Sequence, residues 1–497
     1  MPPLGLLVFV VGAGSLGAEI AAVRLLAPDF GASTIVWANT IGVVLVALAA
    51  GYWLGGRLAD RHPHIRGLCM LSLVAAALLA LVPFAADPLL DVGVKALDSV
   101  SAGAFAGSLL AVLVLVAVPV LLLGGVSPWA LRLAVSDVRT AGSVAGRLYA
   151  LSTAGSLFGT LLSALVLIPL VGTRRTFLVF ALSIALVAML GVWGARRYVL
   201  VPAAIASLMA IPVGTLRANP DGRVIYETET PYQYAQVVQH EDGSRALELN
   251  EGQARHSLYR PGTVLTGDYW DEFLVLPFAS ADRAPRRIAI LGNAAGTTAR
   301  AYGRLHPNTA VDGVEIDGKL SEIGRRYFDM RGPRLNVITQ DARPFLRRTR
   351  QSYDSIFVDA YRQPYIPFYL ATREFFELVE GALRPGGSVI VNVGQPEGSH
   401  ALERVLAATM RTSFTTVLRD RAQRTNTLLL ASDSSASAAR LRANAERVHP
   451  SVSQLARDAA QRLEPALRNG EIYTDDRAPV EWLVDGSLFD YARGARE

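Results

Sequence analysis

The chain has 497 residues, of which 51% are hydrophobic and 18% are charged, and its mean hydropathy of +0.31 is too high for a wholly soluble protein. The single cysteine, Cys69, excludes an internal disulfide, so nothing points to an oxidising compartment. The formal net charge of +5 is spread over scattered arginines without a basic cluster or interleaved aromatics, which argues against a nucleic-acid partner.

The apolar residues are concentrated in the first 215 positions, where they form six long runs, given at the end of this paragraph, and a shorter one. This seventh run, 199–216, carries Pro202 and Pro212. The first run is too long and too glycine-rich for a removed signal peptide, so we expect it to be retained. The sequence therefore predicts an all-α transmembrane bundle of six to seven helices over residues 1–217. Six runs are long enough to cross a hydrocarbon core of about 30 Å: 4–26, 34–55, 67–87, 103–125, 147–171 and 176–195.

The arginines predict how this bundle sits in a lipid bilayer. The loops 57–66 and 132–147 and the pair Arg196 and Arg197 are basic, whereas 86–101 is mostly acidic. The positive-inside rule therefore places the N-terminus and the basic loops in the cytoplasm. Six spans return the chain to the cytoplasm and seven leave it outside. We expect a multi-pass protein of the plasma membrane with a cytoplasmic C-terminal domain.

From Asn219 the composition is that of a soluble protein. Residues 224–239 and 245–249 alternate enough to be strands, with a turn at 241–244 between them. We expect a small β-region over residues 218–280 that ends in a helix at 270–277. An α/β domain is then expected over 281–497, with helices in 434–470.

Residues 287–317 carry the pattern of a βαβ nucleoside-binding unit. An apolar run leads into a turn with Gly292 and Gly296, then a helix to about Leu305, then a second apolar run with Glu315 about 20 residues past the glycines. The glycines let the backbone approach a ligand, and the acid can accept both ribose hydroxyls. Taken alone, a tight strand-to-helix turn without a ligand has the same pattern.

Three further strands follow, over 335–342, 352–360 and 387–393, and the first two end in Asp341 and Asp359. Because ligands of open α/β sheets bind at the carboxyl ends of the strands, these acids are expected to line one crevice with Gly292 and Glu315. An acid at a strand end can also cap the helix that follows. For each acid taken alone, this structural role is the alternative to ligand binding.

Residues 290–393 resemble the adenosyl-binding core of the spermidine synthases. The segment ending in Asp317, the step Gln340–Ala342 and the strand Tyr353–Asp359 stand where that family has its ribose acid, its adenine-contacting acid and its catalytic strand. Thr230–Gln233 is similar to a Tyr-Gln step of the family. With the helices before it, the chain is similar to the membrane-fused spermidine synthase-like proteins. Gly56–Arg61 resembles a loop of major facilitator transporters, so the bundle resembles half of such a transporter.

The resemblance implies a Rossmann-like domain that uses decarboxylated S-adenosylmethionine as co-substrate, with no metal. It implies that Asp359 orients the acceptor amine and takes its proton, because an unprotonated amine has the lone pair that attacks the carbon beside the sulfonium. Tyr361 and Tyr365 are candidates to pack on the alkylammonium chain. The donor contacts that it implies are Gln233, Gly292, Gly296, Glu315, Asp341 and Ala342.

Two departures from the family pattern bear on the substrate. Ala295 stands where the family has an acid that binds the donor's amine, and Arg362 stands where it has a second acid of the catalytic loop. The first hypothesis is a membrane-anchored aminopropyltransferase acting on a small amine such as putrescine, with a homodimer as a candidate assembly. The alternatives are a methyltransferase that uses S-adenosylmethionine and a non-catalytic adenosyl-binding module on a membrane or transport bundle.

Overall fold

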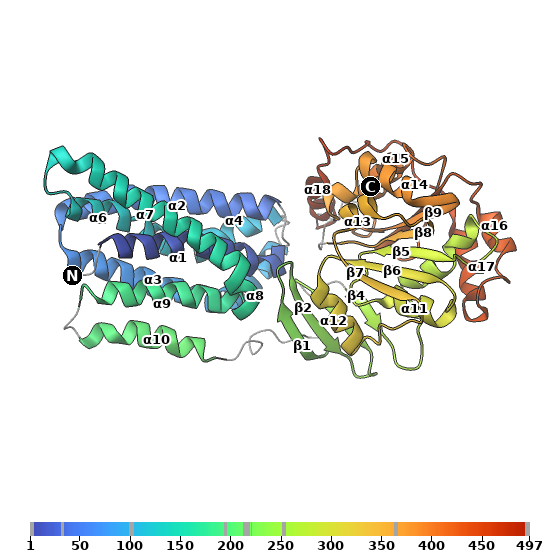
Figure 1. Cartoon of the computed structure of the whole chain (residues 1–497), viewed down its shortest axis with the longest axis horizontal. Coiled ribbons are helices and arrows are strands. Elements are labelled where there is room, and N and C mark those ends of the chain that lie inside the picture. The colour runs from blue at the N-terminus through green and yellow to red at the C-terminus, as the bar shows by residue number, and fades with distance from the viewer. Residues whose placement is uncertain are drawn as a thin grey trace. The chain divides into compact units, whose positions relative to one another are not determined.

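The computed structural model describes residues 4–30, 34–98, 104–192, 196–211, 219, 221–250, 255–361 and 366–492. The chain divides into two compact units (Figure 1). The first comprises Met1–Ala218 with Glu229–Tyr234, and the second comprises Asn219–Thr228 with Ala235–Glu497.

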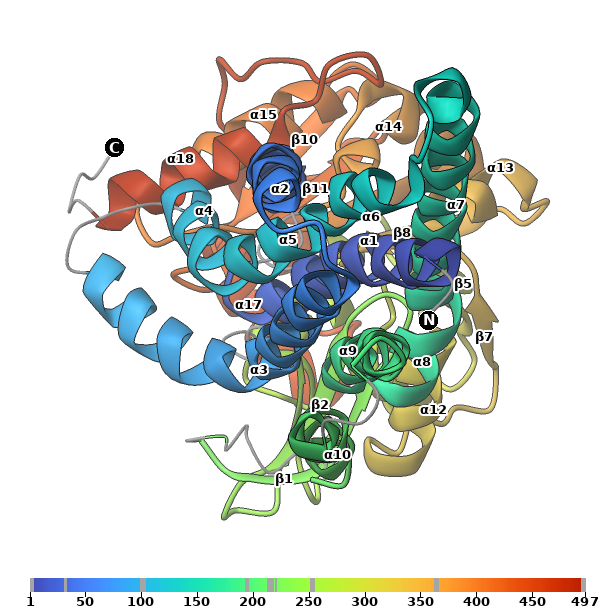
Figure 2. The same ribbon diagram turned by 90° about the vertical axis from the view of Figure 1, so that its left-hand side faces the viewer.

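The first unit is a helical bundle with α1 (Leu4–Phe30) at its centre, packed against most of the other helices (Figure 2). Its core consists of aliphatic and aromatic side chains such as Leu7, Leu79 and Phe177. The other helices are α2 (Thr34–Arg61), α3 (Ile65–Asp98), α4 (Ala104–Leu115), α5 (Ala117–Gly124), α6 (Val126–Ala134), α7 (Ala141–Leu162), α8 (Ile168–Val171), α9 (Thr173–Met189) and α10 (Leu200–Met209).

Prolines divide two of the predicted apolar runs. The run 103–125 is split between α4 and α5, because Pro119 lacks an N–H and its ring clashes with the carbonyl of Leu115, four residues earlier. In the run 147–171, Pro169 follows a short π-helical stretch, Ser163–Leu167, that separates α7 from α8.

Five helical segments among the described residues are long and apolar enough to cross a membrane. The sixth and seventh predicted runs form α9, of 17 residues, and α10, of 10 residues. Ten helical residues extend only about 15 Å, half of a hydrocarbon core. The five segments are Leu4–Ala27, Val36–Arg61, Ile65–Ala86, Ala117–Ala134 and Val138–Val171.

Glycines let α1 and α7 approach closely. A Cβ added to Gly155 would lie 2.1 Å from the carbonyl oxygen of Phe9, and one added to Gly159 would lie 2.1 Å from that of Ala13. Small residues at four-residue spacing are typical of such helix contacts.

The small β-region is a four-stranded sheet in the order β1-β2-β3-β4. The predicted strand 224–239 is in fact two strands, because Thr230–Gln233 forms a turn in which the Thr230 N–H donates to the Gln233 carbonyl at 2.9 Å. The predicted helix at 270–277 is instead two 3-10 turns, η4 (Tyr269–Leu274) and η5 (Leu276–Ala279). The strands are β1 (Arg223–Glu229), β2 (Tyr234–Gln239), β3 (Arg245–Leu249) and β4 (Arg255–Tyr259).

An eight-stranded sheet forms the centre of the second unit, in the order β12-β10-β11-β9-β8-β5-β6-β7. The strands from β9 to β7 pair in parallel, as a Rossmann-like fold requires. Each predicted parallel strand is present. These strands are β5 (Arg287–Leu291), β6 (Ala310–Glu315), β7 (Leu335–Thr339), β8 (Tyr353–Val358) and β9 (Leu383–Gly394).

Three strands that the sequence did not predict extend the sheet with antiparallel pairing: β10 (Thr416–Asp420), β11 (Asn426–Ser432) and β12 (Glu464–Pro465). Helices cover both faces (Figure 1). Phe357 and Val358, neighbours on β8, face opposite cores, as alternating side chains of a buried strand do. The helices are α11 (Thr297–Leu305), α12 (Gly318–Tyr327), α13 (Ala342–Arg348), α14 (Arg373–Ala382), α15 (Ala401–Met410), α16 (Ala438–Ala443), α17 (Ser453–Arg462) and α18 (Val480–Ala492).

Candidate active site

The register of the parallel strands aligns the predicted site residues. Leu291 pairs with Val314 on one side and with Val358 on the other, and Val358 pairs with Val391. The residues that follow these four are therefore neighbours along the carboxyl edge of the sheet. They are Gly292, Glu315, Asp359 and Asn392.

Gly292 brings two of these strand ends together. Its φ is +90°, a value that residues other than glycine rarely adopt. A Cβ at this position would lie 2.4 Å from the Asp359 carbonyl oxygen. Gly296 has a φ of +83° and begins α11. The glycine turn thus packs directly on the backbone of the strand end that carries Asp359.

Glu315 is held by the backbone of the glycine turn. Its Oε2 accepts the Ala294 N–H at 2.8 Å and its Oε1 accepts the Asp317 N–H at 3.0 Å. Burial raises the pKa of Glu315 to about 7, although these two hydrogen bonds favour the charged form. The Ile316 backbone N–H also contacts this carboxylate, so three of its four lone-pair positions are occupied by backbone donors and one is left for a ligand hydroxyl.

Asp341 follows β7 and caps α13. Its Oδ1 accepts the Arg343 N–H at 2.9 Å and its Oδ2 accepts the Tyr369 hydroxyl at 2.8 Å. Asp341 therefore does cap the helix that follows it, which was the structural alternative for this acid. Each of its oxygens retains a second lone pair for a ligand. Ala342 is the first residue of α13 and is buried.

Asp359 is the most densely hydrogen-bonded acid of this edge. Its carboxylate accepts the Tyr269 hydroxyl at 3.1 and 3.2 Å, the Trp270 indole N–H at 3.0 Å and the Asn392 side-chain N–H at 2.8 Å. Burial nevertheless raises the pKa of Asp359 to about 6, because the three donors offset only part of the desolvation. The group is thus an oriented base whose pKa lies close to neutral pH.

The contacts of Tyr361 extend this network. Its hydroxyl donates to the Asn392 carbonyl at 2.9 Å and accepts the Gly394 N–H at 2.6 Å. Asn392 in turn accepts the Asn426 side-chain N–H at 2.9 Å through its Oδ1. Tyr365 and Arg362 lie outside the described residues, so the roles predicted for them stay predictions.

Two other predicted positions lie apart from this row. Gln233 belongs to the segment grouped with the helical unit, where it is buried and its N–H donates to Thr230 Oγ1 at 3.0 Å. Its predicted donor contact stays a prediction. Ala295 is fully buried among apolar side chains such as Leu320 and Phe328, and its N–H donates to Ser257 Oγ at 3.0 Å.

Sequence reasoning missed Tyr269, Trp270 and Asn392. Trp270 lies in the segment 270–277 that was predicted as a connecting helix, and Tyr269 directly precedes it, about 90 positions before the acid that both contact. The sequence did contain a signal for Asn392, because this residue is a single amide within the apolar strand segment Val389–Val393. A buried polar group needs a partner, and here that partner is the Asp359 carboxylate.

The segment 474–482, which contains Asp475, Asp476 and Glu481 and is called the acidic tail here, also contributes a contact at this edge. The Asp475 carboxylate accepts two hydrogen bonds from the guanidinium of Arg343, at 2.8 and 2.5 Å, and one from the Thr372 hydroxyl at 2.8 Å. The Arg343 side chain also donates to the Tyr369 carbonyl at 3.1 Å. The tail therefore braces the residues that surround Asp341.

Comparison with known proteins shows that this part of the chain matches a protein family. The family described as "Spermine/spermidine synthase domain" matches residues 271–428. A "Probable polyamine aminopropyl transferase" of Bifidobacterium longum is 36% identical over 190 residues, which cover 38% of this chain and 42% of that protein. A "Polyamine aminopropyltransferase" of Vibrio vulnificus is 32% identical over 180 residues, which cover 34% of this chain and 58% of that protein.

The chain thus spans about half the length of the curated relatives it matches. Among solved structures, that of a probable spermidine synthase from Corynebacterium glutamicum is 23% identical, covering 51% of this chain and 98% of that one, with a TM-score of 0.38. The matched residues, 271–428, contain Gly292, Glu315, Asp341 and Asp359. The C-terminal part of this chain thus matches the spermine/spermidine synthase domain family over residues 271–428 and is similar there to polyamine aminopropyltransferases.

Proposed function

We propose that this protein is a membrane-anchored aminopropyltransferase that transfers an aminopropyl group from decarboxylated S-adenosylmethionine to a small amine such as putrescine. The single observation that carries the proposal is the Asp359 carboxylate, which three side chains hold beside the glycine turn. Similarity to polyamine aminopropyltransferases over the same residues supports it.

The transfer is a displacement at carbon. The lone pair of the amine nitrogen forms a bond to the propyl carbon next to the sulfonium, the carbon–sulfur bond breaks, and methylthioadenosine leaves with that electron pair. The new ammonium group loses its proton to Asp359. A base within hydrogen-bond reach, with a pKa near the working pH, is suited to orient the amine and accept that proton.

The donor is assigned to the neighbouring strand ends. Glu315 is the proposed acceptor of the ribose hydroxyls, because the Ala294 and Asp317 N–H groups fix the direction of its carboxylate at the strand end. Asp341 accepts the adenine amino group, with Ala342 beside it at the start of α13. Gly292 lets the glycine turn approach the Asp359 carbonyl oxygen, which brings the proposed donor contacts and the proposed base close together.

The helical unit is assigned to the plasma membrane, with the synthase domain in the cytoplasm. Five described segments have the length and apolar character of spans, and α9 adds an apolar helix of 17 residues. If α9 crosses and the ten-residue α10 does not, the chain crosses six times and returns to the side of its N-terminus. The donor is made in the cytoplasm, so that side suits the chemistry.

Ala295 favours one second candidate, a methyltransferase that uses S-adenosylmethionine. This position lies fully buried among apolar side chains, so it offers no acid to the amine of the donor. S-adenosylmethionine retains a carboxylate, which an acid there would repel. The two candidates differ in donor preference and in product, methylthioadenosine or S-adenosylhomocysteine.

The test is calorimetric titration of the full-length protein in detergent with decarboxylated S-adenosylmethionine, S-adenosylmethionine and methylthioadenosine. We expect preference for the decarboxylated donor, and loss of binding in Glu315→Ala and in Asp341→Ala. Preference for S-adenosylmethionine would favour the methyltransferase. Binding without turnover on any amine would indicate a non-catalytic module, and no binding of the three compounds would overturn the enzyme assignment.

A further inference from the structure

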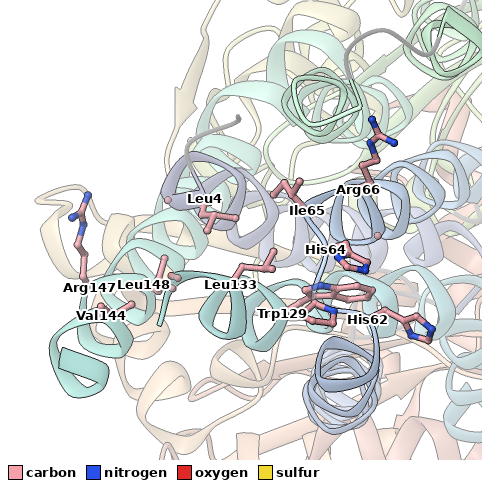
Figure 3. Close-up of a pocket in the computed structure, with 14 residues that line it drawn as sticks. Leu4, His62, His64, Ile65, Arg66, Trp129, Leu133, Val144, Arg147 and Leu148 are labelled. Carbon is pink, nitrogen blue, oxygen red and sulfur yellow. The ribbon is translucent and has the colours of Figure 1, made fainter. Parts of the chain in front are cut away.

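A pocket of about 1330 Å³ opens at one end of the helical unit, and all of its lining residues belong to that unit. The loop between α2 and α3, helices α6 and α7, and the start of α1 form its walls. Figure 3 shows His62, His64 and Trp129 at one end of the pocket and Arg147 with Leu148 at the other. Neither the mechanism nor the family match uses this pocket.

The polar side chains of the pocket carry positive charge or can take it up. His62, His64, Arg66 and Arg147 line it, and its lining contains no aspartate or glutamate. The structure gives these four side chains no ion pair with any described residue, whereas Arg132 nearby pairs with Asp60 at 3.2 Å. Unpaired cations around a concave surface favour an anionic ligand.

A buried donor in the pocket wall also lacks a partner. Trp129 lines the pocket, its side chain is 3% exposed, and its indole Nε1 has no hydrogen-bond partner among the described residues. A buried N–H group without an acceptor is unfavourable, so a donor of this kind in the pocket wall calls for an acceptor. An oxygen of a ligand in the pocket would supply one.

The start of α3 adds backbone donors. The Gly67 and Leu68 N–H groups both donate to the His64 carbonyl, while the N–H groups of Ile65 and Arg66 receive no backbone acceptor in the described chain. Helix α3 has 34 residues, and the N-terminus of a long helix carries partial positive charge that attracts phosphate. The cationic side chains, Trp129 and the first residues of α3 thus all belong to the lining of one pocket.

The remaining walls are apolar. Leu4, Leu133, Val144 and Leu148 line the same pocket. A small inorganic anion would leave these side chains in contact with water, whereas an amphiphile with a charged head and hydrocarbon chains would satisfy both kinds of wall. Basic pockets between membrane helices on the cytoplasmic side are suited to lipid headgroups.

We propose that this pocket binds the phosphate-bearing headgroup of an anionic phospholipid, with the acyl chains along Leu133 and Leu148. The proposal requires that the helical unit lies in a bilayer, and it does not depend on the activity of the synthase domain. It also fits the expected topology, because the pocket is formed by the two basic loops assigned to the cytoplasmic side.

Native mass spectrometry of the full-length protein in detergent tests the proposal, with added phosphatidylglycerol, phosphatidylcholine or inorganic phosphate. We expect phosphatidylglycerol to bind roughly tenfold more tightly than phosphatidylcholine, because each arginine near an anionic headgroup contributes about 1 kcal/mol. The double variant Arg66→Gln/Arg147→Gln should lose roughly tenfold or more of that affinity on the same grounds. Trp129→Phe keeps the ring and removes the N–H, and should weaken binding severalfold.

Arg139→Gln is the matched control, because Arg139 lies in the same basic loop and outside the pocket lining. It removes one charge and should leave the affinity within about twofold. Thermal unfolding of each variant without lipid confirms that it is folded. Equal binding of both lipids, binding of inorganic phosphate alone, or an equal loss in Arg139→Gln and the double variant would each overturn the proposal.

Discussion

The indole N–H of Trp270 donates a hydrogen bond to the carboxylate of Asp359 at 3.0 Å, across 89 positions of sequence. Trp270 lies in a 3-10 turn that precedes the first parallel strand, and Asp359 follows the fourth. The turn η4 therefore positions the proposed base from outside the parallel sheet.

Asp359→Asn should reduce aminopropyl transfer by about 10²–10⁴-fold, because the amide cannot take a proton from the attacking amine. Donor affinity should stay within about threefold, since Glu315 and Asp341 carry the proposed donor contacts. The measurement is steady-state turnover with putrescine beside calorimetric titration of the donor. Equal loss of binding and turnover would show that Asp359 acts on the donor instead.

Tyr269→Phe should move the acidic limb of the pH–rate profile to higher pH. The Tyr269 hydroxyl donates to the charged form of Asp359, so its removal should raise the pKa of Asp359 further above its present value of about 6. A shift of about one pH unit corresponds to one lost hydrogen bond to a charged group.

The pH–rate profile between pH 5 and 8 measures this shift, and Tyr259→Phe is the control. Tyr259 lies in β4, where its ring faces the guanidinium groups of Arg245 and Arg300. Its substitution should leave the acidic limb in place. An unshifted limb in Tyr269→Phe would show that this hydroxyl does not tune the base.

Gly292→Ala should destabilise the synthase domain. A φ of +90° costs an alanine about 1–3 kcal/mol, and the added Cβ, 2.4 Å from the Asp359 carbonyl oxygen, would force the two strand ends apart. Chemical denaturation followed by a probe of the second unit measures the loss.

Gly381→Ala is the matched control, because Gly381 lies in α14 with no atom within 4 Å of an added Cβ. Alanine there should raise stability by about 0.5 kcal/mol, through its better helix propensity. Equal effects of the two substitutions would show that the close approach at Gly292 is not required.

The free energy of unfolding of the ligand-free protein should fall as the pH rises from about 5 to 7. The folded-state pKa of Glu315 is raised to about 7 from its ordinary value of 4.5, so between these values the folded state binds more protons than the unfolded chain. The associated stability is fully present below pH 4.5 and is lost as the pH rises through 7. Asp359, with a pKa of about 6, acts in the same direction.

The fall should amount to at most roughly 3 kcal/mol from Glu315. Glu315→Gln cannot titrate, so its unfolding temperature should depend less steeply on pH over this range while donor binding is lost. The thermal unfolding temperature measured from pH 5 to 8 for both proteins checks this prediction. Parallel curves would show that Glu315 does not carry the effect.

The sequence by itself determined the parallel strands and the acids at their ends. Apolar runs of strand length, glycine turns and acids at fixed positions are local patterns, and the Rossmann-like arrangement joins neighbouring βαβ units by short connections. Glu315, Asp341 and Asp359 were found for that reason. The apolar runs likewise predicted most of the helices of the first unit, because helix length and hydropathy are read along one continuous segment.

Only the tertiary structure decided what surrounds the acids. Tyr269, Trp270 and Asn392 converge on Asp359 because the sheet register and the η4 turn bring distant segments together, and no local period encodes such a contact. The same holds for the basic pocket, where Arg66, Trp129 and Arg147 come from three elements of the bundle. Chemistry at a site depends on distances between side chains, and those distances exist only once the chain has folded.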